Sequence, residues 1–272
     1  NTKSIIESFI HLDNRFKYFT TIKSAKKLNH KKRALDLGIK NSTYNWLLFT
    51  DVDCRVENNW ATAMSKHYHT SDYVIGFSKI NESSTLVSKF QSIDFIMLMV
   101  STYASVSMNY PLACSGQNQS YKKKLYNKVG GFDKIKNLLQ GDDSIFLQMC
   151  NKINNVKISF STDKNSYVVA KTHTKWKDFL LQRMRWAGDA NIMWKFNKLF
   201  YIVILSTFIS SVFILYLLFF RHFTVFIYLV IIKLFFELAI YYLGTNKLDI
   251  KTKYSSFLIW FIIQVPYIII MG

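Results

Sequence analysis

The chain has 272 residues, of which 50% are hydrophobic and 17% aromatic, and its formal charge is +18 from 35 Lys and Arg against 17 Asp and Glu. This length allows one sizeable domain with a membrane region, and the charge favours an anionic partner such as nucleic acid, a membrane surface or a phosphorylated substrate. Cys54, Cys114 and Cys150 show no C-x-x-C spacing, which argues against a disulfide framework and a zinc site, so we expect reduced thiols facing the cytoplasm.

The first two thirds of the chain predict alternating helices and strands. We expect helices over 2–12, 31–40 and 59–69, and strands over 16–20, 46–49 and 73–77. The run Trp46-Leu47-Leu48-Phe49 is apolar throughout, as is typical of a strand buried on both faces. Alternation of this kind indicates an α/β fold with a mainly parallel sheet, in which ligands bind beyond the carboxyl ends of the strands.

Two carboxylates follow this apolar strand directly, in Asp51-Val52-Asp53. Alternate residues leaving a strand point the same way. A pair of carboxylates so placed can hold Mg²⁺ or Mn²⁺, which in turn binds a diphosphate. A solvated turn is the other interpretation of this pattern.

Two further motifs carry chemically active side chains. Gly141-Asp142-Asp143 precedes an apolar run, where paired acids can cap a helix or supply a general base. Gln182, Arg185 and Trp186 lie on a basic, aromatic-rich segment over 173–198. That segment predicts an amphipathic helix at the membrane interface, with its Trp and Phe side chains at headgroup depth.

Three apolar stretches follow, over 199–220, 223–243 and 255–271. Each is long enough to cross a hydrocarbon core of about 30 Å or nearly so, so we expect a multi-pass membrane protein. Basic residues before the first span and between the last two place those segments, and the catalytic domain, in the cytoplasm. Lys233 and Glu237 lie four residues apart inside the second span and should pair, either as a helix-packing ion pair or as a contact to an acceptor lipid.

Taken together, these motifs resemble family 2 glycosyltransferases, the GT-A fold enzymes that include cellulose, chitin and hyaluronan synthases and ceramide glucosyltransferase. The segments that carry the resemblance, in chain order, are Asp51-Val52-Asp53, Ser115 to Tyr121, Val129-Gly130-Gly131-Phe132-Asp133, Gly141-Asp142-Asp143 and Gln182 to Trp186. The resemblance implies a partial GT-A (Rossmann-like) mixed-sheet domain over 1–172, the interfacial segment over 173–198 and a transmembrane region over 199–272. It also implies that the family's first two strands precede residue 1, so we expect a piece of a longer chain, truncated at the N-terminus and also at the C-terminus.

The resemblance assigns a role to each motif residue. Asp53 and Asp51 hold Mg²⁺ or Mn²⁺ against the diphosphate of a nucleotide-sugar donor, with a UDP-sugar favoured, and Arg185 stabilises the leaving diphosphate. Asp143 is the general base of an inverting transfer. Gln182, Trp186 and Asp142 bind a lipid or glycan acceptor.

Three functions remain open at this point. A metal-dependent single transfer to a lipid or lipid-linked sugar, at a bacterial inner membrane, is the preferred one. A processive polysaccharide synthase is the first alternative, and a non-catalytic membrane-surface binding protein is the second. Nucleic acid is not expected as a partner, because much of the basic charge flanks the membrane spans.

Overall fold

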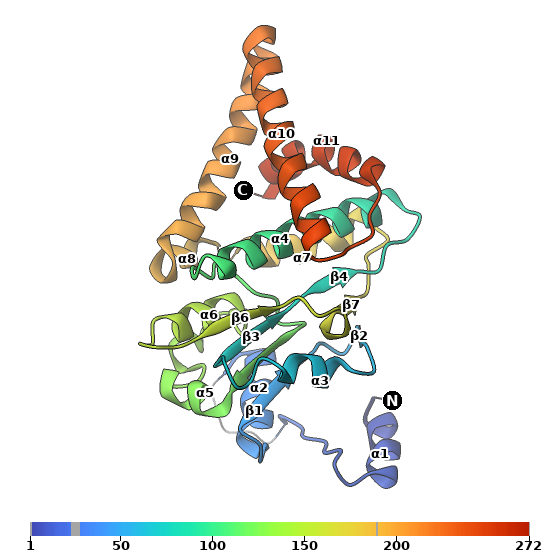
Figure 1. The fold of residues 1–272 in the computed structure, drawn as a ribbon, viewed down its shortest axis with the longest axis vertical. Helices are drawn as coiled ribbons and strands as arrows, with labels where there is room; N and C mark the ends of the chain where they lie inside the picture. The colour runs from blue at the N-terminus through green and yellow to red at the C-terminus, as the bar shows by residue number, and fades with distance from the viewer. Residues whose placement is uncertain (1, 23–27, 189, 272) are drawn as a thin grey trace.

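The computed structural model describes residues 2–22, 28–188 and 190–271. It is a mixed α/β structure whose C-terminal helices extend away from the sheets (Figure 1). The N-terminal helix α1 (Thr2–Leu12) lies at the opposite end of the molecule from the helices that the sequence assigns to the membrane.

Two small mixed sheets form the β-structure. The larger has the order β1 (Trp46–Phe49), β5 (Gln119–Lys122), β3 (Tyr73–Gly76) and β6 (Ile158–Ser161). The smaller has the order β2 (Cys54–Val56), β7 (Val168–Ala170) and β4 (Ser78–Ile80). β5 is antiparallel to both its neighbours and β2 is antiparallel to β7, whereas β3–β6 and β4–β7 are parallel. The expected mixed sheet is confirmed, and the mainly parallel sheet inferred from alternation alone is wrong.

Three local predictions also need correction. β1 is an edge strand of the described sheet and only its Leu47 is buried, so the strand expected to be buried on both faces is wrong. Residues 16–20 are not part of any sheet, so the strand expected there is wrong. The helix expected over 59–69 is the shorter α3 (Trp60–Ser65), which ends in a series of turns.

An aromatic core fills the space between the larger sheet and the helices beside it. Those helices are α2 (His30–Asn41), α5 (Lys123–Val129) and α6 (Ser144–Asn151). Tyr121 of β5 lies 4.9 Å from Phe146 of α6 and 5.3 Å from Tyr73 of β3, measured between ring centroids. Because aromatic rings bury large apolar areas, this cluster fixes α6 and its N-terminus against the sheet.

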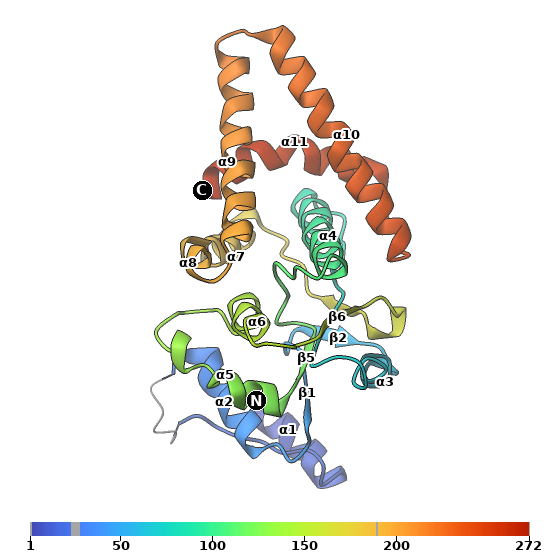
Figure 2. The same cartoon turned by 60° about the vertical axis from the view of Figure 1, so that its left-hand side comes forward.

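Helix α4 (Leu86–Ser107) lies between the sheets and the C-terminal helices (Figure 2). Most of its residues are buried, and it contacts β4, β6, α7, α10 and α11. Its contact with α10 is tight, since a Cβ atom on Gly244 would lie only 2.2 Å from Cγ1 of Val100. Only glycine permits the two helices to approach this closely.

The C-terminal part consists of α7 (Trp176–Ala187), α8 (Ala190–Phe196), α9 (Lys198–Phe219), α10 (Phe223–Lys247) and α11 (Tyr254–Met271). Of these, α9, α10 and α11 are long and apolar enough to cross a membrane, which agrees with the predicted spans. Both views show α9 and α10 as a hairpin and α11 lying across its lower part, above α4 (Figures 1 and 2).

The predicted pair inside the second apolar helix is formed. The ammonium of Lys233 contacts the carboxylate of Glu237, and the amide of Gln264 on α11 donates to the same carboxylate. The ion pair lies within α10, and the hydrogen bond from Gln264 ties α11 to it.

Candidate active site

The turn after β1 separates the surroundings of Asp51 and Asp53. The backbone amide of Cys54 donates to the carbonyl of Asp51 over 3.1 Å and closes this turn. Asp51 contacts Lys31, whereas Asp53 lines a cleft together with Gln117. The strand end therefore presents one carboxylate to a lysine and the other to the cleft.

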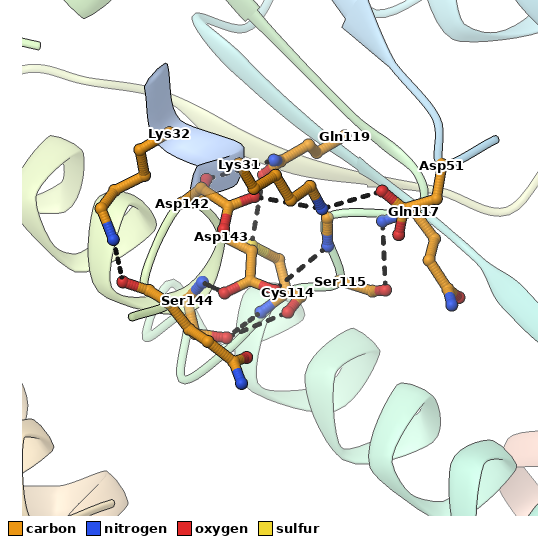
Figure 3. A network of polar contacts seen from close by, with 12 residues as sticks. Lys31, Lys32, Asp51, Cys114, Ser115, Gln117, Gln119, Asp142, Asp143 and Ser144 are labelled. Atoms are coloured by element: carbon orange, nitrogen blue, oxygen red, sulfur yellow. Dashed lines mark hydrogen bonds and ion pairs between the residues drawn. The ribbon is translucent and has the colours of Figure 1, made fainter. Parts of the chain in front are cut away.

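Lys31, in the first turn of α2, joins the two acidic motifs (Figure 3). Its Nζ atom lies 2.8 Å from Oδ1 of Asp51 and 3.2 Å from Oδ2 of Asp142. Burial lowers the pKa of Lys31, but the carboxylates of Asp142 and Asp51 outweigh this effect and raise the pKa above its ordinary value. The sequence predicted Lys31 only as a helix residue. Its place in the basic helix that precedes the acid-bearing strand is the sole signal for this role.

Asp143 caps α6 and also has an unusual pKa. Its Oδ1 atom accepts a hydrogen bond of 2.6 Å from the amide of Ser144, and its Oδ2 atom accepts one of 3.3 Å from the amide of Gly116. Burial, followed by the negative charge of Asp142, raises the pKa of Asp143 to about 6, although the two amide bonds and Lys31 act in the opposite direction. A carboxyl group with such a pKa is suited to exchange protons near neutral pH.

Gly116 lies at the point where these groups meet. A Cβ atom at this position would be 3.2 Å from Nζ of Lys31, 3.5 Å from Oδ2 of Asp142 and 3.6 Å from Oδ2 of Asp143. The loop is held in place by Ser144, whose Oγ atom donates to the carbonyl of Cys114 over 2.9 Å. A side chain at this position would therefore crowd Lys31 and both carboxylates.

The cleft has a volume of about 270 Å³. Its lining includes Asp53, Gln117, Lys171, Gln182, Arg185 and Trp186. The Oε1 atoms of Gln117 and Gln182 are buried and accept no hydrogen bond from the residues that the structure describes. Buried carbonyl oxygens without a donor are rare, and they suit a ligand that carries hydroxyl groups. Lys171 and Arg185 add positive charge that suits phosphate.

Helix α7 brings Gln182, Arg185 and Trp186 to the same cleft that Asp53 lines. Its aromatic residues do not all face lipid. Phe179 is fully buried against Phe90, and Trp176 packs beside both. The expectation of an aromatic face at headgroup depth is therefore wrong for Phe179, because Phe90 of α4 and Tyr267 of α11 cover it.

Arg183, on the same helix, is a residue that the sequence counted only among the basic charges before the first span. It is 4% exposed and pairs with Asp94 of α4 over 2.7 Å. It also lines the cleft. The Q-R-M-R-W run gave no signal for this role, since a buried arginine and an interfacial one look alike in sequence.

The residues of the cleft fit a divalent cation that takes few protein ligands. No group of three His, Cys, Asp or Glu side chains within 2–22, 28–188 and 190–271 forms a metal cluster. The Asp53 carboxylate nevertheless lines the cleft and makes no ion pair with the described residues. Mg²⁺ needs only one or two carboxylates when phosphate oxygens supply further ligands.

Comparison with known families gives one result that covers nearly the whole chain. The family model described as Glycosyl transferase family 21 matches residues 5–265, which include the acidic motifs, α7 and the apolar helices α9 and α10. No curated protein matches the chain.

Proposed function

Because the chain belongs to glycosyl transferase family 21, we propose that it moves a sugar from a nucleotide-sugar donor to a lipid or lipid-linked acceptor, with inversion at the anomeric carbon. The family match and the apolar helices make it a membrane glycosyltransferase. The glycosyltransferase predicted from the sequence is thus confirmed, and the family is number 21, not specifically family 2. The observation that carries the finer proposal is the cleft itself, which Asp53, Gln182, Arg185 and Trp186 line. The loop before the lining residue Gln117 is hydrogen-bonded to Asp143, a carboxyl group of raised pKa.

The basic and acidic side chains of the cleft support a nucleotide diphosphate donor, and we favour a UDP-sugar. Arg185 presents a guanidinium, which matches phosphate oxygens in a bidentate manner. Lys171 lies in the same lining and adds a second cation. Asp53, which lines the cleft, would hold Mg²⁺ or Mn²⁺, which neutralises the diphosphate. Asp51 at the same turn is paired with Lys31 and would have to leave that lysine to join the metal.

Asp143 supplies the base in this proposal. Its carboxylate takes the proton from the acceptor hydroxyl as that oxygen forms a bond to the anomeric carbon. The bond between that carbon and the diphosphate oxygen breaks, and the nucleoside diphosphate leaves with the electron pair. Arg185 stabilises the developing negative charge. Asp143 accepts a hydrogen bond from Gly116, whose neighbour Gln117 lines the cleft, which links the proposed base to the loop that forms part of the lining.

The acceptor side of the cleft is formed by α7. The buried Oε1 of Gln182 suits a hydroxyl donor, and Trp186 offers a ring face on which a sugar can stack. Asp142, which is 6% exposed and paired with Lys31, is the acidic residue that we assign to the acceptor site. Because α7 directly precedes α8 and α9, the acceptor approaches from the membrane surface, which favours a lipid-linked molecule.

Single transfer is favoured over processive synthesis. Three helices of membrane-spanning length are described, and a channel for a growing polymer usually needs more. Basic residues at the end of α10 and in the segment after it, Lys247, Lys251 and Lys253, support a cytoplasmic catalytic side, and we propose a bacterial inner membrane as the location.

The experiment uses the full chain in membranes, a panel of labelled UDP- and GDP-sugars, and total membrane lipid as acceptor. We expect one donor to label a lipid of low mass, and Asp143→Asn to abolish this labelling while donor binding persists. Asparagine is also a good N-cap, so α6 should remain intact. Asp178→Asn, an exposed acid on α7, is the matched control. Labelling that persists in Asp143→Asn removes this residue from the mechanism, and no labelling with any donor contradicts the proposed function.

A further inference from the structure

A second polar centre lies between the membrane helices and the cleft, where Asp94 of α4 binds two side chains from distant elements. Its Oδ2 atom lies 2.7 Å from the NH2 nitrogen of Arg183 on α7. Its Oδ1 atom accepts a hydrogen bond of 3.3 Å from the indole nitrogen of Trp260 on α11. We call Asp94, Arg183 and Trp260 the Asp94 junction.

The junction reaches the cleft through Arg183. The Cζ atom of its guanidinium lies 4.2 Å from the centroid of the Trp186 ring, close enough for a cation–π contact. Both Arg183 and Trp186 line the cleft, so the face that the arginine covers belongs to a side chain of the candidate acceptor site. Phe95, the residue after Asp94, also packs beside Trp186, with ring centroids 6.2 Å apart.

The side chains of the Asp94 junction are mostly buried, so each depends on the contacts that the others make. Arg183 is 4% exposed, its Asp94 partner is 13% exposed at the side chain, and Trp260 is 5% exposed. Removing one member of a buried ion pair leaves the other charge uncompensated. The contacts of the junction therefore define one position of Arg183, and with it one position for the ring that it covers.

We propose that Arg183 is a positioning residue that sets the orientation of Trp186 in the cleft, and that Asp94 makes this orientation depend on Trp260 of the apolar helix α11. Acceptor binding is thereby coupled to the packing of α11 against α4. The acceptor part of this inference rests on the proposed function, whereas the orientation of Trp186 does not.

The first experiment measures the ring directly. The chain holds six tryptophans, so 5-fluorotryptophan labelling of the full chain in nanodiscs gives a small set of ¹⁹F resonances, and Trp186→Phe assigns the one of interest. We expect Arg183→Gln to shift and broaden the Trp186 resonance, and Trp260→Phe to shift it in the same direction. Trp194→Phe, on an exposed tryptophan of α8, should leave it unchanged.

Two further variants keep the test valid if a single charge removal unfolds the chain. Asp94→Asn combined with Arg183→Gln removes both charges together, which leaves no unpaired ion in the core. Arg183→Lys keeps the ion pair but loses the planar guanidinium that covers the ring. We expect both to alter the Trp186 resonance in a chain that melts at the temperature of the unmodified protein.

The second experiment uses the labelled sugar nucleotide that gives transfer in the panel, with total membrane lipid as acceptor. Arg183→Lys and Trp260→Phe should raise the KM for lipid by about fivefold with kcat changed by less than about twofold, because a cation–π contact that only orients the ring affects acceptor binding. Lys177→Gln, an exposed cation of α7, is the control.

The outcomes separate the two proposals. A Trp186 resonance that is unchanged in folded Arg183→Lys and Trp260→Phe overturns the positioning role. A shifted resonance with an unchanged KM for lipid overturns the coupling to the acceptor. A panel without any transfer contradicts the proposed function and still leaves the resonance experiment to decide on the junction.

Discussion

The Nζ atom of Lys31 lies 2.8 Å from Oδ1 of Asp51, and the same ammonium contacts Asp142. One cation thus joins the strand-end motif to the acids that precede α6. A movement of Asp51 or Asp142 toward the cleft would therefore change the charges around the other carboxylate.

The pH dependence of transfer should report on Asp143. The base must be ionised to accept a proton, and the pKa of Asp143 is raised to about 6, so the rate should fall as the pH drops through about 6. Lys31 is one of the groups that lower this pKa. Lys31→Met should therefore raise it further and move the acidic limb to higher pH. Initial rates between about pH 5 and 9 test this.

Lys66→Met serves as the control for that profile, since this lysine pairs with Asp163 at the surface and should leave the acidic limb in place. An acidic limb that stays at the same pH in Lys31→Met contradicts the electrostatic role of Lys31.

Metal binding should depend on Asp53. We expect Asp53→Ala to weaken Mn²⁺ binding in the presence of UDP by more than about tenfold, since even outer-shell changes cost that much at metal sites. Electron paramagnetic resonance of free Mn²⁺ measures this without any turnover. Asp163→Ala, at a surface ion pair, is the control. An unchanged titration in Asp53→Ala would show that this carboxylate is not a ligand.

Gly116→Ala should reduce transfer more than stability. The new methyl group would lie 3.2 Å from Nζ of Lys31, so the ammonium must shift away from the acids around it. We expect a loss of about tenfold in kcat/KM, or roughly 1.4 kcal/mol of transition-state stabilisation. The melting temperature should change little, because the lysine is flexible. Full activity in this variant would mean that the position of Lys31 is unimportant.

Gly244→Ala should loosen α10 from α4. Its Cβ atom would lie 2.2 Å from Cγ1 of Val100, and overpacking of this kind costs about 1–3 kcal/mol of the free energy of unfolding. Gly38→Ala is a matched control on helix α2, where nothing lies within 4 Å of the new atom, and it should stabilise the chain. Thermal unfolding in detergent compares the two. Val100→Ala should rescue Gly244→Ala, and independent effects of the two changes would contradict the contact.

Local sequence patterns predicted the first two helices and the apolar spans well, whereas the sequence analysis predicted no helix at α4 (Leu86–Ser107). The bounds of α1, Thr2–Leu12, agree with the prediction, and α9 to α11 agree to within a few residues. Apolar periodicity and span length are properties of a single segment, so neighbours in space change them little.

Strand neighbours and the charged contacts of the site could not be predicted in the same way. β1 is at a sheet edge because β5, about seventy residues later, pairs with it on one side only. The same holds for Lys31, whose partners Asp51 and Asp142 belong to two distant loops. Arg183 looks like any interfacial cation until α4 supplies Asp94. Each of these roles is created by tertiary contacts.

The close packing of Gly244 on Val100 has a practical consequence for work on this protein. α4 also meets α11 through Phe90 and Tyr267, and the hydroxyl of Tyr167 donates to the carbonyl of Leu248 at the end of α10. Cutting the chain before α9 would strip one side of α4 of its apolar cover. A water-soluble catalytic fragment is therefore not a suitable reagent, and crystallisation or screening requires the intact chain in a lipid-like solvent.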